Sequence, residues 1–268
     1  MMRSTGISMG LSVCVLAGCA DVVSVPLLGD ATYPEGIAAH AGTNQLFVGG
    51  LANGDIQRID ARGDASYFKE ANEDGLLNVV GLAVDPDRDR LFVCSTSFAD
   101  PTVLPSLVVF DTETGEQIAS LSAPADGLPH FFNDVTVDRS GRAYVTDSFA
   151  PVVYAVDVDL TSIDVLASDP AFVVDPSGFN LNGIAVTTDD RFAIVSVATL
   201  GGVGRLFRIG LGDGEAVLPS HTRSGRSFGP GGLIQIEQET TEQPGGHRVV
   251  SPIRVAGAGV IPVQQPPG

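Results

Sequence analysis

A degraded repeat recurs along most of this chain at intervals close to fifty residues. The copies can be aligned on the residue that directly precedes a recurring Gly or Asp. The aligned column then contains Glu35, Val80, Asn133, Asn182 and Gly231. The steps along that column are 45, 53, 49 and 49 residues. A period of this length predicts an architecture in which one supersecondary unit packs against its own copies.

Each copy contains short runs of alternating apolar and polar residues, which are typical of half-buried β-strands. The third run reads DIQRIDA, SLVVFDT, PVVYAVD and GRLFRIG in successive copies, and residues 65–70 and 116–121 fit an outer fourth strand. No segment keeps a helical period. Because each such sheet needs neighbours to cover both faces, the pattern predicts an all-β fold, a β-propeller of about six four-stranded blades.

We expect the propeller to span residues 33–250. Residues 20–32 are interpreted as a linker with a candidate closing strand, and residues 251–268 as an irregular C-terminal tail. The repeat fades after residue 234, and a sixth copy would begin beyond the 268 residues of the chain. The last blade is therefore expected to be incomplete or irregular, with a five-bladed ring or a truncated chain as alternatives.

The first 19 residues have the features of a targeting segment, with Arg3 ahead of a short apolar run from Ile7 to Gly18. That run is too short to span a bilayer. The sequence LAGC at residues 16–19 resembles the bacterial lipobox, which implies a signal peptide over residues 1–19 and a lipid on Cys19. We therefore expect an exported protein anchored to the bacterial cell envelope; ordinary cleavage near Ala20 is the alternative.

Acidic residues outnumber Lys and Arg by 32 to 15, which gives a formal net charge of −17. Nucleic acids and anionic lipid headgroups need a surplus of Lys and Arg, so neither is an expected partner. We expect a monomer that acts on a small molecule and meets the membrane only through its anchor. The acidic surplus serves solubility, or some of the carboxylates face a hard cation such as Ca²⁺.

The repeat column itself supplies the candidate binding residues. First strands of propeller blades line the central channel, so Glu35, Asn133 and Asn182 are expected to converge on one point of its axis. One carboxylate and two amide oxygens suit Ca²⁺ or another divalent cation. The alternatives are that Glu35 is a buried, hydrogen-bonded carboxylate without a metal, and that the Asn residues only shape turns.

The motifs PEG, FND and LNG, with the blocks at residues 132–148 and 180–196, resemble the gluconolactonase and regucalcin (senescence marker protein) family of six-bladed propellers. The resemblance implies that Glu35 and Asn182 bind the metal and that Asn133 contacts the substrate or the metal. The family also has an Asp-Gly motif whose Asp binds the metal and acts as the general base. This chain has Gly231 and Gly232 there.

The resemblance thus implies a calcium-dependent hydrolase of a lactone or related ester with impaired catalysis. Asp134 and His130 are the candidates to replace the missing base. His130 lies on a loop three residues before Asn133, where the alternative is a histidine that is simply solvated. A clean strand alternation would point Asp134 away from Asn133. The alternative is a non-catalytic propeller lipoprotein that binds a small molecule or a protein.

Two further interpretations rest on local pattern. The acidic clusters at residues 85–90, 138–142 and 188–191 are interpreted as turns between first and second strands, because Asp and Gly favour turn geometry. Cys94 lies in an alternating run and is interpreted as a small apolar strand residue, not as a nucleophile.

Overall fold

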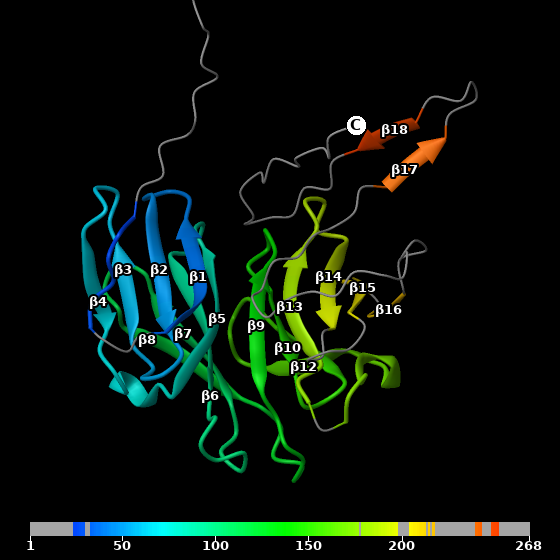
Figure 1. The fold of residues 1–268 in the computed structure, drawn as a ribbon, viewed down its shortest axis with the longest axis horizontal. Coiled ribbons are helices and arrows are strands. Elements are labelled where there is room, and N and C mark those ends of the chain that lie inside the picture. The colour runs from blue at the N-terminus through cyan, green and yellow to red at the C-terminus, as the bar shows by residue number, and fades with distance from the viewer. Residues whose placement is uncertain are drawn as a thin grey trace, which may run out of the picture.

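The computed structural model describes residues 24–29, 33–176, 178–197, 204–212, 214, 216–217, 239–242 and 248–251. These residues form four four-stranded antiparallel sheets, each in sequential strand order, and a separate hairpin (Figure 1). Blade 1 contains β1 (Pro34–His40), β2 (Gln45–Gly50), β3 (Ile56–Ile59) and β4 (Ala65–Lys69). Blade 2 contains β5 (Asn78–Asp85), β6 (Arg90–Thr96), β7 (Ser106–Asp111) and β8 (Gln117–Ser122).

Blade 3 contains β9 (Phe132–Val137), β10 (Ala143–Asp147), β11 (Val152–Val156) and β12 (Ile163–Ser168). Blade 4 contains β13 (Leu181–Val186), β14 (Phe192–Val197), β15 (Arg205–Gly210) and β16 (Ala216–Val217). The hairpin pairs β17 (Glu239–Glu242) with β18 (Arg248–Ser251), and two short 3₁₀ helices cover Glu73–Gly75 and Pro170–Phe172.

The four blades confirm the propeller arrangement predicted from the repeat. The first strands β1, β5, β9 and β13 contact one another in chain order, so each blade places its first strand on the inside (Figure 1). The expected third strands are β3, β7, β11 and β15, and the expected outer strands at residues 65–70 and 116–121 are β4 and β8. The described residues hold four blades, not about six.

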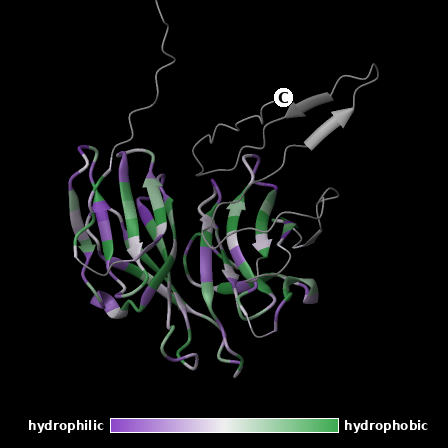
Figure 2. Ribbon diagram, in the orientation of Figure 1, coloured by the Kyte–Doolittle hydropathy of each residue, from purple (hydrophilic) through white to green (hydrophobic). Residues whose placement is uncertain are grey.

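The hydrophobic core is divided among the three interfaces between these blades. In β6, Leu91 and Val93 pack toward blade 1, while Phe92 and Cys94 pack toward blade 3. A third cluster fills the space between blades 3 and 4, and Figure 2 shows hydrophobic residues concentrated along the strands. Alternation therefore serves both faces of an inner blade. Cys94 is a buried free thiol within this packing, as predicted.

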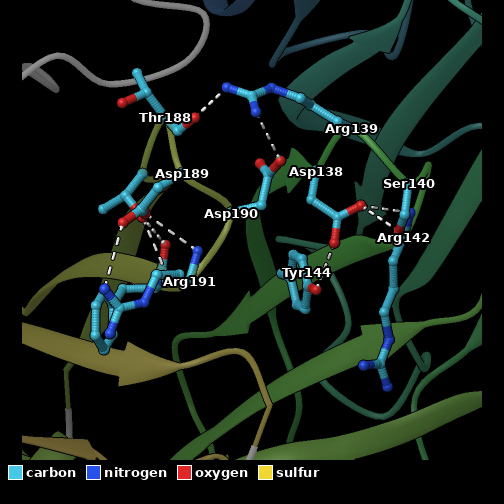
Figure 3. A network of polar contacts seen from close by, with 11 residues as sticks. Asp138, Arg139, Ser140, Arg142, Tyr144, Thr188, Asp189, Asp190 and Arg191 are labelled. Carbon is cyan, nitrogen blue, oxygen red and sulfur yellow. Dashed lines mark hydrogen bonds and ion pairs between the residues drawn. The ribbon is translucent and has the colours of Figure 1, made fainter.

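The acidic clusters form turns, as predicted. In the turn between β9 and β10, Asp138 Oδ1 accepts hydrogen bonds from the Ser140 hydroxyl at 2.6 Å and from the Arg142 backbone N–H at 3.1 Å. The Tyr144 hydroxyl donates to Asp138 Oδ2 at 2.8 Å, and Gly141 adopts a φ of 89° that favours glycine (Figure 3). The carboxylate of Asp138 is thus occupied in shaping the turn.

The same network joins blade 3 to blade 4. Arg139 donates to the backbone carbonyl of Thr188 and forms an ion pair with Asp190 at 3.5 Å (Figure 3). A cavity of about 570 Å³ lies between the two turns and is lined by Asp138, Arg142, Arg191 and Arg208 among others. Arg142 pairs with Asp157 at 3.4 Å, so acidic neighbours offset much of the positive charge here.

The segment expected as a closing strand is described only from residue 24 to residue 29, where it forms no strand. The backbone N–H and carbonyl of Leu28 exchange hydrogen bonds with the side chain of Gln57 on β3, at 2.7 and 2.9 Å. Cys19, the lipobox and Gly231 lie outside the described residues, as do residues 252–268 of the expected tail. No helix in the described ranges is long and apolar enough to cross a membrane.

Candidate functional site

The repeat column is the site of a β-bulge in every blade. In blade 1 the pairing passes from Pro34 opposite Gly50 to Ile37 opposite Val48, so two residues of β1 oppose Gly49 alone. The corresponding bulged pairs in β5, β9 and β13 are 80–81, 133–134 and 182–183. A bulge bends a strand and redirects its side chains, and such bulges are common beside active sites.

Close approach of the first strands explains the glycine of the motif. A Cβ on Gly36 would lie 2.1 Å from the carbonyl oxygen of Val80 on β5. A Cβ on Gly81 would lie 2.5 Å from Cα of Asp134 on β9. Both distances are shorter than real Cβ contacts, so the second bulge position must be glycine in blades 1 and 2. Blade 3 has Asp134 at the same position.

Asp134 uses its carboxylate to join two first strands. Its Oδ2 accepts the backbone N–H of Ile184 on β13 at 3.0 Å, and its Oδ1 accepts the N–H of Val135 at 2.9 Å. Burial raises the pKa of this carboxyl to about 6, although both hydrogen bonds act to lower it. The clean alternation assumed from the sequence is interrupted here, because Asn133 and Asp134 both lie in the bulge opposite Thr146.

Glu35 occupies the first bulge position of blade 1. Its side chain is accessible to solvent, yet surrounding protein atoms desolvate the carboxylate and raise its pKa to about 7. The negative charge of Asp134 is the second cause of this shift. Burial raises the pKa of the Cys94 thiol, and the charges of Asp134 and Glu35 add to the effect. The two carboxylates therefore lie near each other across blade 2.

Neither carboxylate has a cationic neighbour that lowers its pKa within the described part of the chain. The Glu35 side chain also accepts no hydrogen bond there. Two desolvated acids of like charge are unfavourable unless they hold a proton or face a cation. This pair is therefore the chemically distinctive feature of the first-strand ends.

Asn133 and Asn182 lie on neighbouring first strands. The Asn133 side-chain amide donates to the Ser148 hydroxyl at 2.9 Å, which leaves its Oδ1 as an acceptor. Ser148 in turn donates to the backbone carbonyl of Leu181. Asn182 accepts the Gly183 N–H through its side-chain oxygen at 2.9 Å. The structure thus places both Asn residues at the bulge level. Among the predicted metal and catalytic residues in the described ranges, Glu35 and Asp134 are the pair that interacts electrostatically.

His130 is buried and lies in a network of its own. Its Nδ1 is 2.6 Å from Asp147 Oδ2 and its Nε2 is 3.1 Å from Asp126 Oδ1. The hydrogen bond with Asp147 is the main cause of a raised His130 pKa, because two carboxylates at the two ring nitrogens favour the imidazolium form. The histidine expected on a solvated loop is instead engaged at both nitrogens.

Asp147, at the end of β10, uses one carboxylate oxygen to bind the backbone of the adjoining loops. Asp147 Oδ1 accepts the backbone N–H groups of Phe131, Phe149 and Ala150 at 3.0, 3.0 and 3.1 Å. Sequence reasoning missed Asn180, whose buried side chain accepts the N–H groups of Val174 and Asp175 at 2.7 and 2.9 Å. No repeat column marks Asn180, so periodicity offered no signal for it.

The donor chemistry at the bulges fits a hard cation. No cluster of three or more His, Cys, Asp or Glu side chains suited to a metal occurs among the described residues. The oxygen atoms of Glu35, Asp134, Asn133 and Asn182 are the available donors, and oxygen donors suit Ca²⁺ or Mg²⁺ better than Zn²⁺. A cation here would depend on amide oxygens and water as well as on carboxylates.

No known protein-family model matches this sequence, and no curated protein matches it either. Solved structures do match its fold. They include a hydrazine synthase from Kuenenia stuttgartiensis at 17% identity and TM-score 0.55, and a gluconolactonase from Xanthomonas campestris at 20% identity and TM-score 0.52. A chain of a mitotic checkpoint complex matches at 11% identity and TM-score 0.51.

These matches cover 70%, 70% and 80% of this chain. The chain spans only 49%, 62% and 58% of the matched chains. At such low identities a shared fold carries no shared activity. The comparisons therefore show a β-propeller fold, with a gluconolactonase among its structural neighbours.

Proposed function

We propose that this chain is a calcium-dependent hydrolase of a lactone or related ester, with its site at the Glu35–Asp134 pair. The observation that carries the proposal is the approach of two desolvated carboxylates from separate blades, with no cationic side chain that lowers their pKa values in the described ranges. Their pKa values of about 7 and 6 lie close to neutral pH, where a general base works best. The gluconolactonase-like motifs and the gluconolactonase neighbour support the substrate class.

Asp134 is the proposed base. It takes a proton from the attacking water as the water oxygen adds to the ester carbonyl carbon. The ring C–O bond then breaks, and Asp134 returns the proton to the departing oxygen. His130 remains a second candidate, but both of its ring nitrogens face carboxylates, whereas each Asp134 oxygen accepts one backbone N–H and keeps a second lone pair for a proton.

Glu35, Asn182 and the free Oδ1 of Asn133 would hold the cation, and Asn133 would also orient the substrate. A bound Ca²⁺ would polarise the ester carbonyl and supply the positive charge that the two acids lack. The bulges at these positions bend the first strands and so change the directions of their side chains.

We further propose a closed ring of about six blades in an exported monomer anchored through Cys19. Ile37 is exposed on the face of blade 1 that points away from blade 2, a face that a further blade would cover. Replacing Cys19 with Ser should release the protein from the membrane fraction, and a wild-type protein already found in the soluble fraction would contradict the anchor.

The test combines binding and turnover. Because a ligand that binds only the native state stabilises it, Ca²⁺ at a hundred times its Kd should add about 2.7 kcal/mol. That corresponds to a rise in Tm of roughly 5–10 °C over the chelated protein. Hydrolysis of a lactone, followed by acid release over a panel of lactones, should require the same Ca²⁺.

Glu35→Gln should abolish both effects, while the exposed turn variant Glu113→Gln should leave both intact. A Tm that is the same with Ca²⁺ and with chelator would refute the cation site. Hydrolysis that persists unchanged in Glu35→Gln and Asp134→Asn would show that Glu35 and Asp134 do not catalyse the reaction. Calcium binding without hydrolysis of any ester or lactone would favour a non-catalytic binding propeller.

A further inference from the structure

Four phenylalanines from four different loops form a cluster beside the candidate site. The ring centroids of Phe98, Phe149 and Phe179 lie 4.9, 5.3 and 4.9 Å from that of Phe131. Phe131 is buried, whereas Phe98 is 50% exposed and Phe179 is 37% exposed. An apolar surface is therefore held in place by a buried ring but left open to solvent.

Strand pairing locates this cluster at the same end of the blades as the bulges. Phe132 at the start of β9 pairs with Asp147 at the end of β10, so Phe131 and Phe149 flank one end of blade 3. The starts of β5 and β13 pair likewise with the ends of β6 and β14, and the loops with Phe98 and Phe179 adjoin those ends. In Figure 1 the loops near residues 97–105 and 123–131 extend from this end of blades 2 and 3.

Short hydrogen-bonded paths connect the cluster to the bulge residues. Asn133 donates to the hydroxyl of Ser148, the residue next to Phe149. The backbone N–H of Asn180, the residue next to Phe179, donates to the carbonyl of Ser148 at 3.1 Å. Asn133, Phe149 and the neighbour of Phe179 are thus connected to the same short segment at residues 147–149.

We infer that the substrate of this site carries an apolar chain or ring, which lies against Phe98 and Phe179 while its ester group reaches the bulges. This inference rests on the proposed function, since it specifies the substrate class of that same site. Polyhydroxylated sugar lactones present less apolar surface to the exposed rings and carry hydroxyl groups that would lose water there. An alkyl-substituted lactone covers them, and each methylene fully removed from water strengthens binding about fourfold.

A small-molecule chain fits this surface better than a membrane does. The exposed rings pack against Phe131, three residues before Asp134, and the chain is strongly acidic overall. Insertion into a bilayer would carry those acids toward lipid headgroups. An alkyl chain a few carbons long needs only the ring surface, with the polar ester left at the strand ends.

The protein contains no tryptophan, which permits a clean test. Phe98→Trp creates a single tryptophan reporter, and its emission is titrated with γ-octalactone, γ-butyrolactone and D-glucono-δ-lactone in the full chain. We expect a blue shift with γ-octalactone at a Kd at least tenfold below that for γ-butyrolactone, and no response to the sugar lactone. Hydrolysis rates of the wild-type protein should follow the same order.

Phe179→Ser should reduce the γ-octalactone preference about tenfold in both measurements. The control Val165→Ser, at an exposed residue of the outer strand β12, should leave the preference unchanged. Equal binding of all three lactones, or a reporter that responds only to phosphatidylcholine vesicles, would overturn the inference.

The two proposals fail in different ways. Binding of γ-octalactone without hydrolysis would keep the apolar ligand class and refute the hydrolase. Hydrolysis of D-glucono-δ-lactone without any gain from an alkyl chain would keep the hydrolase and refute the apolar substrate.

Discussion

Removing the His130 side chain tests whether this residue stabilises the fold. The variant His130→Ala leaves Asp147, whose side chain has no exposed surface, without its positively charged partner. Three backbone N–H groups would still contact Asp147 Oδ1, but Oδ2 would lose its 2.6 Å bond to the imidazole. Breaking a buried ion pair from one side typically costs about 3–5 kcal/mol.

His40 supplies a matched control. His130 and His40 are 4% and 3% exposed, but Asp89, the partner of His40, is 51% exposed and can be solvated by water. His40→Ala should therefore cost mainly its own packing and the hydrogen bond from Gly42, about 1–2 kcal/mol. The difference between the two variants isolates the uncompensated Asp147 at about 2–3 kcal/mol.

The pH dependence gives an independent check. Because the folded-state pKa of His130 is raised above its usual 6.5, the stability it contributes is fully present below that value. That stability is lost as pH rises through the raised folded pKa. Urea denaturation followed by circular dichroism should show a larger gap between wild type and His130→Ala at pH 6 than at pH 9. Equal losses for His40→Ala and His130→Ala, or a gap that widens toward pH 9, would refute this reasoning.

Three further predictions concern the site and its frame. Gly36→Ala should lower the free energy of unfolding by about 3 kcal/mol, because the new Cβ would collide with the backbone of β5. The control Gly212→Ala should change it little, because nothing lies within 4 Å of the added Cβ. Urea midpoints measure both effects. With chelator present, wild-type stability should fall as pH rises from about 4 to 7, because the raised pKa of Asp134 favours the protonated folded state. Asp134→Asn should reduce that fall by about 2–3 kcal/mol. Denaturation measured across this pH range would contradict the prediction if the stability of the two proteins fell equally with pH. Asn180→Ala should expose two backbone amides in the loop before β13 to faster hydrogen exchange while amides of β6 stay protected, and unchanged exchange in that loop would contradict its role.

The strands were predictable because their burial is periodic. Residues Leu91 to Cys94 alternate between two blade interfaces. Because successive strand residues face opposite sides of the sheet, this burial produces a period of two in the sequence. The repeat also predicts the number of strands in each blade, because the strands that lie within one period belong to one blade. The further repeat expected at Gly231 stays a prediction, because that residue lies outside the described residues.

The bulges were not predictable from alternation. A bulge adds one residue to a strand without changing its composition, so the run through Asn133 and Asp134 still resembles a regular strand. The glycines at 36 and 81 were the available signal, since a recurring glycine inside a strand often marks a bulge or a close backbone approach. The column was therefore found correctly, while the direction of its side chains was not.

The environment of His130 was also beyond reach. Its partner Asp147 lies seventeen residues away, at the far end of the β9–β10 hairpin, and no local pattern connects the two. The expectation of a solvated loop histidine follows from average behaviour, which long-range pairing overrides. Neither this pair nor Asn180 lies in the repeat column, so periodicity does not identify them.

The site arises where the blades depart from their repeat. All four first strands have the same bulge, yet Glu35 uses its first position and Asp134 uses its second. The two carboxylates meet across blade 2, whose bulge contributes only Val80 and Gly81. A Cβ on Gly81 would lie 2.5 Å from Oδ1 of Asp134, so any larger residue there would displace the carboxylate. Gly81 is therefore as necessary to the acid pair as Glu35 and Asp134 themselves. The missing side chain at this repeat position in blade 2 leaves the room in which the two carboxylates approach each other.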